Sequence, residues 1–555
     1  WTREYAPSRI THYESARYRN EDVLYDYSFL DLYSRMYPES EEIESYLKRD
    51  GSKPFLLVEY CHAMGNGPGD LEDYFQMIQE NDLMCGGFVW EWCDHAIAHG
   101  ETEDGRKRYY YGGDHGEKIH DGNFCMDGLV YPDRTPHTGL LEYRNVHRPA
   151  RIVSYDERNR ELRLRNYLDF TDLKDYVKIR YEVSCDGICA GTGELPDMSI
   201  KPHEEAVMAL PVTVPQTGRA FLKLIYQKKE ASALVPDGHV LGFDEIRLSN
   251  QDGRNQTALR WLNRTDKAVG RVDVEETNSK VICRGRNFAY TYDKRAGGFI
   301  SLLYAGREYL DRPMQFNLWR APTDNDRYIK EEWKRARYHE AGTRTYGIVI
   351  RQTKDTVTIE SVMSVSAASV QRMLDMEVCW TIDGNGGIGA VIRVWKNKEF
   401  PELPRFGIRF FLKKELENIT YYGMGPMESY CDKHRAASHG LYRARVEEMH
   451  EDYIRPQENG SHYDCDYVEL TNGQYGIAAA SETPFSFNAS PYTQEELERA
   501  EHNDQLRKSD STVLCLDYAM NGIGSNSCGP KTWKPYRFDD VEFTFALRLV
   551  PFVKG

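Results

Sequence analysis

The chain has 555 residues, 40% of them hydrophobic and 28% charged, with 12 cysteines and a formal net charge of −16. This length is too great for one hydrophobic core and indicates about three domains. The acidic balance argues against nucleic acids and anionic membranes as partners, since both bind clustered Lys and Arg, and no apolar run approaches the roughly 20 residues that cross a bilayer. The cysteines are irregularly spaced without a C-x-x-C pair, which favours reduced thiols over disulfides or a zinc site. We therefore expect a cytoplasmic protein.

Strand-like and helical segments alternate over residues 1–148. Short runs at 10–13 and 28–33 have strand character, and 54–60 is a nearly continuous apolar run of the kind that parallel sheets bury on both faces. Residues 69–81 have helical spacing, and 86–92 follow as the next strand. This rhythm predicts an α/β layer or barrel. About four strands are recognisable, half of the eight that a closed (β/α)8 TIM barrel requires.

Strand patterns dominate the rest of the chain. From 149 to 250, short runs of alternating apolar and polar residues are separated by turn residues, which predicts a small immunoglobulin-like β-sandwich. A polar stretch within 251–269 is expected to be a linker. From 270 to 555 the strand patterns continue without a helical rhythm, which predicts a large antiparallel β-sandwich. The predicted fold is thus multidomain, with an α/β part followed by all-β parts.

A carboxylate interrupts the apolar run at 54–60. Glu59 follows four apolar residues, at the C-terminal mouth of the predicted parallel strand, where barrel enzymes place catalytic groups. A strand-end Glu is more often a salt-bridge partner or a cap. The next strand, however, ends at Trp90, and indole faces stack on the apolar face of a pyranose. Tyr37, His62 and Asn66 add polar groups, so the pattern predicts a carbohydrate site around Glu59.

The same residues resemble a known family. The segments Glu59-Tyr-Cys-His-Ala-Met-Gly-Asn66 and Gly86-Gly-Phe-Val-Trp-Glu-Trp92 are similar to the nucleophile signature of glycoside hydrolase family 2 β-galactosidases. The similarity continues in the family's order through 112–114, 123–130, 133–137, 320–326, 422–430 and 455–460. It implies the C-terminal half of a TIM barrel (1–148), an immunoglobulin-like β-sandwich (149–250), a linker (251–269) and the large β-sandwich of β-galactosidases (270–555).

The resemblance implies a role for each matching residue. Glu59 matches the nucleophile that forms a covalent galactosyl-enzyme in a retaining double displacement, and Tyr37 matches the tyrosine that hydrogen-bonds it. Phe124, through its backbone carbonyl, and Asp127 match ligands of Na+, and the complete enzyme is expected to use Mg2+ as well. Val513 falls near a tryptophan that some members use as a platform for the second sugar. The residues implied to bind substrate are His62, Trp90, Asn66 and Asp127.

The family's acid/base glutamate has no counterpart. Retaining glycosidases need two carboxyl groups about 5–5.5 Å apart, yet no Gly-Asn-Glu-type motif lies upstream of Glu59. Glu91, Asp94 and Glu142 lie in the same zone, but none matches the acid/base position. Most ligands of Mg2+ are also expected outside the chain, and a half barrel would leave an unpaired strand edge. We therefore expect a fragment, or a subunit completed by another polypeptide, that is inactive alone.

The expected activity is hydrolysis of terminal β-D-galactose residues from β-galactosides such as lactose, by a homo-oligomer of the complete enzyme. Other family 2 glycosidases, a β-glucuronidase or a β-mannosidase, are the alternatives within the family. A non-catalytic carbohydrate-binding subunit is the alternative from another class, since aromatic residues and a Glu can bind sugar without turnover. A metal hydrolase is disfavoured, because the 16 histidines show no H-E-x-x-H spacing.

Overall fold

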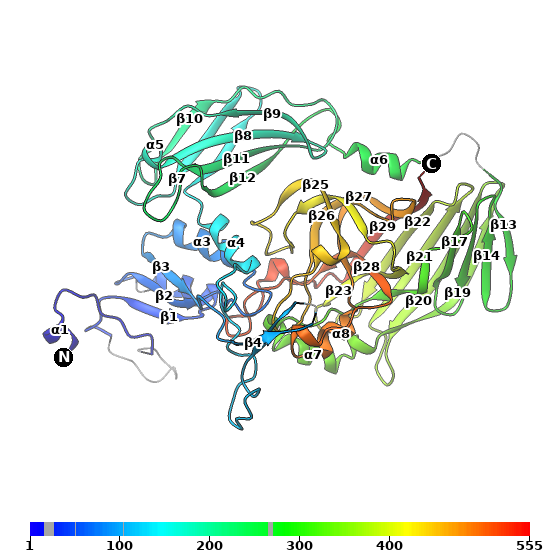
Figure 1. Cartoon of the computed structure of the whole chain (residues 1–555), viewed down its shortest axis with the longest axis horizontal. Helices are drawn as coiled ribbons and strands as arrows, with labels where there is room; N and C mark the ends of the chain where they lie inside the picture. Colours follow the sequence, from blue (N-terminus) through cyan, green and yellow to red (C-terminus); the bar gives the residue numbers. More distant parts are fainter. Residues whose placement is uncertain (16–26, 50, 104, 265–269, 555) are drawn as a thin grey trace.

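The computed structural model describes residues 1–15, 27–49, 51–103, 105–264 and 270–554. An α/β part at the N-terminal end is followed by a small β-rich part and then by a large one that holds most of the strands (Figure 1). This agrees with the predicted combination of α/β and all-β parts. No helix in the described ranges is long and apolar enough to span a membrane. All twelve cysteines lie in these ranges and are free.

Three parallel strands in the order β1-β2-β3 form the sheet of the N-terminal part. Helices connect them, because parallel neighbours need a crossover. In the helix between the second and third strands, the ring of Tyr74 packs 5.5 Å from that of Tyr60. The elements are α1 (Thr2–Tyr5), β1 (Tyr33–Met36), α2 (Ser40–Arg49), β2 (Phe55–Tyr60), α3 (Leu71–Glu80), β3 (Met84–Val89), the hairpin β4 (Ile97–Glu101) and β5 (Lys107–Tyr110), and α4 (Thr138–Val146).

Three of the predicted strands of this part differ in the structure. The run expected at 28–33 becomes a strand only at Tyr33, where β1 begins. The run at 10–13 is not a strand, and its apolar side chains Ile10 and Tyr13 are exposed, so no neighbouring strand buries them. The described parallel sheet therefore has three strands rather than about four. The strand expected at 86–92 stops at Val89 because the chain then pairs with a different segment: Glu91 N–H donates to the carbonyl of Asp127, and Leu129 N–H donates to that of Glu91. Trp90 thus begins a loop.

Two antiparallel sheets face each other in the small β-rich part. One has the order β10-β7-β6 and the other the order β12-β11-β8-β9. Inward-pointing residues such as Leu162, Leu164, Leu222 and Leu224 form a common core, as the alternating pattern predicts. The elements are β6 (Ala150–Asp156), β7 (Glu161–Asn166), α5 (Leu173–Tyr176), β8 (Val177–Cys185), β9 (Ile188–Glu194), β10 (Glu205–Ala209), β11 (Ala220–Lys228) and β12 (Val240–Leu248).

A short helix occupies part of the stretch expected to be a linker. Helix α6 (Gln256–Leu262) begins at Asn255, whose side chain accepts a hydrogen bond from Ala258 N–H at 2.9 Å, a favourable N-cap. Ala258 is buried, and the indole N–H of Trp261 donates to Glu469 at 2.9 Å. Helix α6 is therefore packed against the large β-rich part, whereas residues 251 and 252 hydrogen-bond to residues 216–218 of the small β-rich part.

Two sheets also build the large β-rich part. The first holds β13 (Asp273–Glu276), β14 (Lys280–Arg284), β15 (Phe288–Asp293), β16 (Gly298–Tyr304) and β17 (Arg307–Glu308) in sequence order. The second has twelve strands: β18 (Leu310–Asn317), β19 (Gly342–Gln352), β20 (Thr356–Ser366), β21 (Leu374–Asp383), β22 (Ile388–Lys396), β23 (Arg405–Lys413), β24 (Asn418–Gly425), β25 (Ser438–Arg445), β26 (Ser461–Thr471), β27 (Tyr475–Ser490), β28 (Ser511–Met520) and β29 (Glu542–Val553). Short helices join them: η1 (Asp324–Asp326), α7 (Ile329–Arg335), η2 (Tyr338–Glu340), η3 (Val446–Met449), α8 (Gln494–Arg499), η4 (Asn503–Gln505) and η5 (Lys534–Tyr536).

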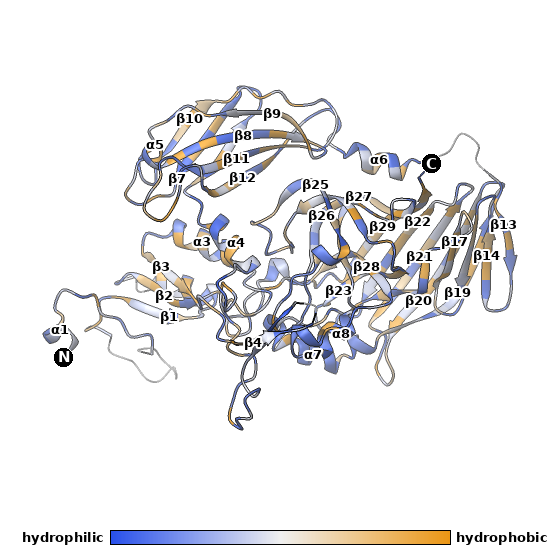
Figure 2. Cartoon of the chain, viewed as in Figure 1, coloured by the Kyte–Doolittle hydropathy of each residue, from blue (hydrophilic) through white to orange (hydrophobic). Residues whose placement is uncertain are grey.

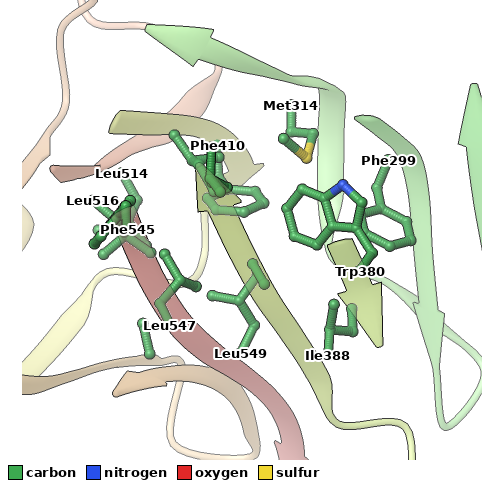
Figure 3. Close-up of a cluster of buried hydrophobic side chains, with 14 of the residues drawn as sticks. Phe299, Met314, Trp380, Ile388, Phe410, Leu514, Leu516, Phe545, Leu547 and Leu549 are labelled. Carbon is green, nitrogen blue, oxygen red and sulfur yellow. The ribbon is translucent and has the colours of Figure 1, made fainter. Parts of the chain in front are cut away.

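The main hydrophobic core lies in this large part. Hydrophobic and hydrophilic residues alternate along its strands (Figure 2). Trp380 is fully buried, with its ring centroid 5.1 Å from that of Phe299, and Met314, Ile388 and Phe410 lie around it (Figure 3). This core draws on strands from both sheets of the large part.

Candidate active site

Glu59 lies near the C-terminal end of β2, beside the end of β1. In the parallel ladder it pairs with Met36, and Tyr37 N–H donates to the Glu59 carbonyl at 2.8 Å. The carboxyl ends of neighbouring parallel strands meet at one edge of the sheet. The topology therefore brings Tyr37 and Glu59 together, as predicted for these two residues.

The Glu59 carboxyl is half-buried, and burial is the largest cause of its raised pKa. The Tyr37 hydroxyl and the charge of His62 oppose this rise, while the charge of Glu14 adds to it. Burial and the charge of Glu59 in turn raise the pKa of Tyr37. The Tyr37 hydroxyl approaches the carboxylate without the geometry of an ordinary hydrogen bond, and it has no other partner among the described residues. Among the charges that raise the pKa of Tyr37, that of Glu59 is the largest, ahead of those of Cys528 and Asp127.

His62 is buried in the loop after β2 and is held on several sides. Its Nδ1 lies 2.7 Å from the hydroxyl of Ser527, and its Nε2 lies 3.5 Å from a carboxylate oxygen of Asp127. The ring stacks on Phe124, with centroids 5.2 Å apart, and meets the Tyr37 ring edge-on at 5.8 Å. These contacts fix the ring beside the nucleophile candidate.

Asp127 is a buried carboxylate that joins His62 to Trp90. The indole N–H of Trp90 donates to its Oδ2 at 3.0 Å, and the indole itself is 39% exposed, so one part of the ring remains open to a ligand. Burial alone would raise the pKa of Asp127, but the hydrogen bonds with His62 and Trp90 outweigh it and lower the pKa. Its Oδ1 is buried and finds no partner in the described part of the chain. The carboxyl of Glu91 also interacts with Asp127. A carboxylate oxygen without a donor can accept a hydroxyl or contact a cation.

Asn66 does not face this site. It is fully buried, and its amide nitrogen donates to the Tyr430 hydroxyl at 3.0 Å and to the Glu458 carbonyl at 2.8 Å. Its amide oxygen accepts from Lys433 at 2.7 Å. The side chain predicted to bind substrate is therefore occupied by the large β-rich part. Gly65 permits this close docking, since a side chain there would meet Gln457 at 2.4 Å.

Two of the neighbouring carboxylates serve the fold. Asp94 receives His137 Nε2 at 2.8 Å and Gly128 N–H at 2.8 Å. Glu142 accepts backbone N–H groups from three consecutive residues, 434–436, at 3.2, 2.9 and 2.7 Å. Glu91 is closer to the site: its pKa is raised by burial and by the charge of Asp127.

Residues from the large β-rich part complete the surroundings, and the sequence did not reveal them. Ser527 contacts His62, and the guanidinium of Arg327 lies 4.5 Å from the centre of the Phe124 ring. The charge of Glu59 also raises the pKa of the Cys528 thiol, after the larger effect of burial. Val513, expected near the platform for a second sugar, is instead buried inside β28, where it pairs with Phe411. The segment that reaches Glu59 is 521–529, which follows β28.

Three family models match the chain in order. They are "Glycosyl hydrolases family 2, TIM barrel domain" over residues 1–152, "Beta-galactosidase, domain 4" over 162–249 and "Beta galactosidase small chain" over 284–549.

The chain is also similar to curated proteins. It is 42% identical to a β-galactosidase of Actinobacillus pleuropneumoniae, with 99% of this chain and 53% of the relative aligned. It is 36% identical to a β-galactosidase of Staphylococcus xylosus, with 98% and 54% aligned. A β-galactosidase of Lactobacillus delbrueckii subsp. bulgaricus is 30% identical, with 99% and 52% aligned. The chain spans about half the length of these relatives. It belongs to glycoside hydrolase family 2, and the curated relatives that it matches are β-galactosidases.

Proposed function

We propose that the protein containing this chain hydrolyses terminal, non-reducing β-D-galactose residues of β-galactosides such as lactose. The observation that carries this proposal is the carboxylate of Glu59, half-buried at the end of β2, with Tyr37 set beside it by the pairing of β1 and β2. Trp90 supplies a partly exposed indole for the apolar face of a pyranose. His62 and Asp127 supply acceptors for its hydroxyls.

The chemistry follows from a nucleophilic carboxylate. Ionised Glu59 attacks the anomeric carbon as the glycosidic bond breaks, and the resulting glycosyl ester is then hydrolysed by water, so that the configuration is retained. The Tyr37 hydroxyl stabilises the carboxylate when it departs. Protonation of the leaving oxygen needs a second carboxyl group. Glu91, Asp94 and Glu142 do not match the family's acid/base position, and the latter two are engaged in internal hydrogen bonds. We therefore propose an acid/base glutamate outside this chain, and no turnover by the chain alone.

A cation site is compatible with Asp127. Its buried Oδ1 has no partner in the described ranges, which fits a hard cation such as Na+, with the backbone carbonyl of Phe124 as a second ligand. When bound, such an ion would orient a substrate hydroxyl. We expect Mg2+ in the complete enzyme, with its ligands mostly outside these residues. A homo-oligomeric, cytoplasmic enzyme without nucleic-acid or membrane partners remains our proposal for the whole protein.

Covalent labelling of the full-length protein tests this function. A 2-deoxy-2-fluoro-β-galactosyl reagent should accumulate as an ester on Glu59, located by peptide mass spectrometry, and Glu59→Gln should abolish both labelling and hydrolysis of a nitrophenyl β-galactoside. Glu80→Gln is the matched control, since it makes the same change at an exposed position at the end of α3 and should retain labelling. Faster hydrolysis of the corresponding glucuronide or mannoside would favour another family 2 activity. Sugar binding without labelling would indicate a non-catalytic subunit.

A further inference from the structure

A cavity of about 350 Å³ lies in the large β-rich part, where β26, β27 and β28 meet the segment 535–540. Its volume falls in the lower part of the range for small-molecule sites, about 300–1,000 Å³. We call it the β28 cavity and define it by five of its lining residues: Tyr463, Ser486, Tyr518, Arg537 and Asp540. None of the residues described around Glu59 lines it, so it is distinct from the candidate active site.

Two tyrosines give the β28 cavity its aromatic walls. Tyr463, near the start of β26, is 36% exposed, so part of its ring is open to a ligand. The ring of Tyr518 stacks on Phe543, with centroids 4.6 Å apart and an angle of 11° between the planes. Neither hydroxyl makes a hydrogen bond to a described residue. An aromatic face beside free hydroxyls suits a ligand with one apolar face and several polar groups, such as a pyranose.

Ser486 adds a buried hydroxyl to the same cavity. Phe485 and Phe487, on either side of it in β27, belong to the main hydrophobic core. Alternate residues of a strand point to opposite faces, so Ser486 points away from that core, and it lines the β28 cavity. It is only 8% exposed, and its hydroxyl has no hydrogen-bond partner in the described part of the chain. A buried hydroxyl is costly unless it is paired, which favours a ligand that supplies a polar group here.

The charged groups that line the cavity balance one another. Asp464 is engaged by Arg219 and by His439, each at 2.6 Å. Arg537 uses only its Nε within the described chain, for a backbone carbonyl at 2.6 Å, and Asp540 is exposed without an ion-pair partner among the described residues. One free guanidinium and one free carboxylate leave no net charge for an ionic ligand. They offer donors and acceptors to the hydroxyl groups of a neutral ligand.

The segment that forms one wall is fixed to the rest of the fold. Gly522 N–H donates to the carbonyl of Tyr536 at 2.8 Å, and the Tyr536 hydroxyl lies 3.0 Å from both carboxylate oxygens of Asp73. Phe538 N–H donates to the side-chain oxygen of Asn521 at 3.0 Å. A site held in this way keeps its geometry in the absence of ligand.

We propose that the β28 cavity is a second binding site of this protein, for a neutral mono- or disaccharide, separate from the site around Glu59. The apolar face of the sugar lies against Tyr463. Its hydroxyl groups bond to Ser486, Arg537 and Asp540. A neutral sugar is favoured over an ionic ligand because the charged lining groups balance, and over an apolar ligand because the buried hydroxyl needs a polar partner.

The test measures sugar binding by the full-length protein after Glu59 has been esterified with the 2-deoxy-2-fluorogalactosyl reagent, which fills the site around Glu59. Lactose, maltose and galacturonate are titrated by ligand-observed NMR up to about 50 mM, which fills a site with a Kd of about 1 mM. We expect saturable binding of at least one of the two neutral sugars. No saturable binding of either would overturn the inference, as would tighter binding of galacturonate, which would indicate an anion site.

Variants of the cavity locate the bound sugar. Tyr463→Ala removes the open ring face and should weaken binding about 10-fold. Tyr518→Phe keeps the ring packed in the core but removes its hydroxyl, and should weaken binding about 3–10-fold. Tyr346→Ala is the matched control, since it removes a tyrosine that is 48% exposed on β19, and the affinity should not change. Equal affinities of wild type, Tyr463→Ala and Tyr518→Phe would overturn the inference, because the sugar would then bind elsewhere.

This inference and the proposed function fail separately. The cavity variants lie outside the site around Glu59, so each should hydrolyse a nitrophenyl β-galactoside within about 2-fold of wild type. If wild type neither hydrolyses this substrate nor accepts the label, the proposed function fails, and the same titration of unlabelled wild type and Tyr463→Ala still tests the cavity. If the labelled wild type binds no sugar, only the second site fails.

Discussion

Asp70 and Asp432 are two buried carboxylates that anchor the segment carrying Ser527, and their ionisation should make stability depend on pH. Both are fully removed from solvent, and burial raises the pKa of each from 3.8 to about 6. The charge of Asp432 contributes to the shift of Asp70. Hydrogen bonds from the Ser525 hydroxyl and from the backbone at residues 523 and 524 oppose the shifts without cancelling them.

The sign of the effect follows from proton binding. Between pH 3.8 and 6 the folded state holds protons on these carboxyls that the unfolded chain releases, so their contribution to stability falls as pH rises through that interval. At 1.36 kcal/mol per pKa unit, ionising each group in the folded protein costs about 3 kcal/mol at neutral pH. Asp70→Asn removes one such cost, and its amide oxygen can still accept from Ser525.

The assay is urea unfolding of the full-length protein at pH 4.5 and pH 7.5. The free energy of unfolding of Asp70→Asn minus that of wild type should be about 2 kcal/mol larger at pH 7.5 than at pH 4.5. This is the share of the ionisation cost that develops between these two pH values. Constant effects of the amide cancel in this comparison. Asp82→Asn, a change at an exposed position just after α3, controls for the loss of charge. If the difference in free energy of unfolding between Asp70→Asn and wild type is the same at both pH values, the reasoning is refuted.

Three other predictions concern the site and the interface. Tyr37→Phe should raise the pKa of Glu59 and so move the acidic limb of the kcat/KM profile to higher pH. Glu14→Gln should lower that pKa and move the limb to lower pH. A shift in the same direction for both variants would contradict this. Trp90→Ala removes a hydrogen bond to a buried carboxylate and should lower kcat/KM about 10–100-fold, mainly through KM. Burial alone would lower the pKa of His439, but hydrogen bonds to two carboxylates outweigh it and raise the pKa. Protonated His439 therefore stabilises the folded protein fully below pH 6.5, and this stabilisation is lost as the pH rises through the raised pKa of the folded state. Denaturation of His439→Gln should therefore show a larger deficit at pH 6 than at pH 9.

The local pattern of the sequence was enough to locate Glu59. A carboxylate after four apolar residues marks the end of a buried strand, and parallel strands bring their ends to one edge, so Tyr37 could be placed beside it. The alternation in the β-rich parts likewise predicted sheets. The N-cap Asn255, before residues that favour a helix, was a signal for α6 that the polar composition of the stretch concealed.

Contacts between distant segments could not be read in the same way. Asn66 stands in the loop that follows Glu59, but its partners lie more than 360 residues away in the chain. They make a predicted sugar ligand a residue that docks the two parts. Ser527 is 465 residues from His62, and no periodicity connects them. Val513 shows the converse: its position in the chain suggested the site, but it lies inside a strand buried on both faces.

The interface between the α/β part and the large β-rich part explains why the site depends on both. Lys433 is 98% buried and donates to Asn66 and Thr138 of the α/β part, each at 2.7 Å, and to Glu428 of its own part at 3.2 Å. A buried ammonium is costly unless its hydrogen bonds are satisfied, and two of its acceptors exist only when the parts are docked. Undocking would therefore leave Lys433 short of partners at the same time as it freed the loop that carries His62. Lys433 therefore joins the two parts through Asn66 and Thr138, and Ser527 joins them through His62, so the surroundings of Glu59 depend on the docking of both parts.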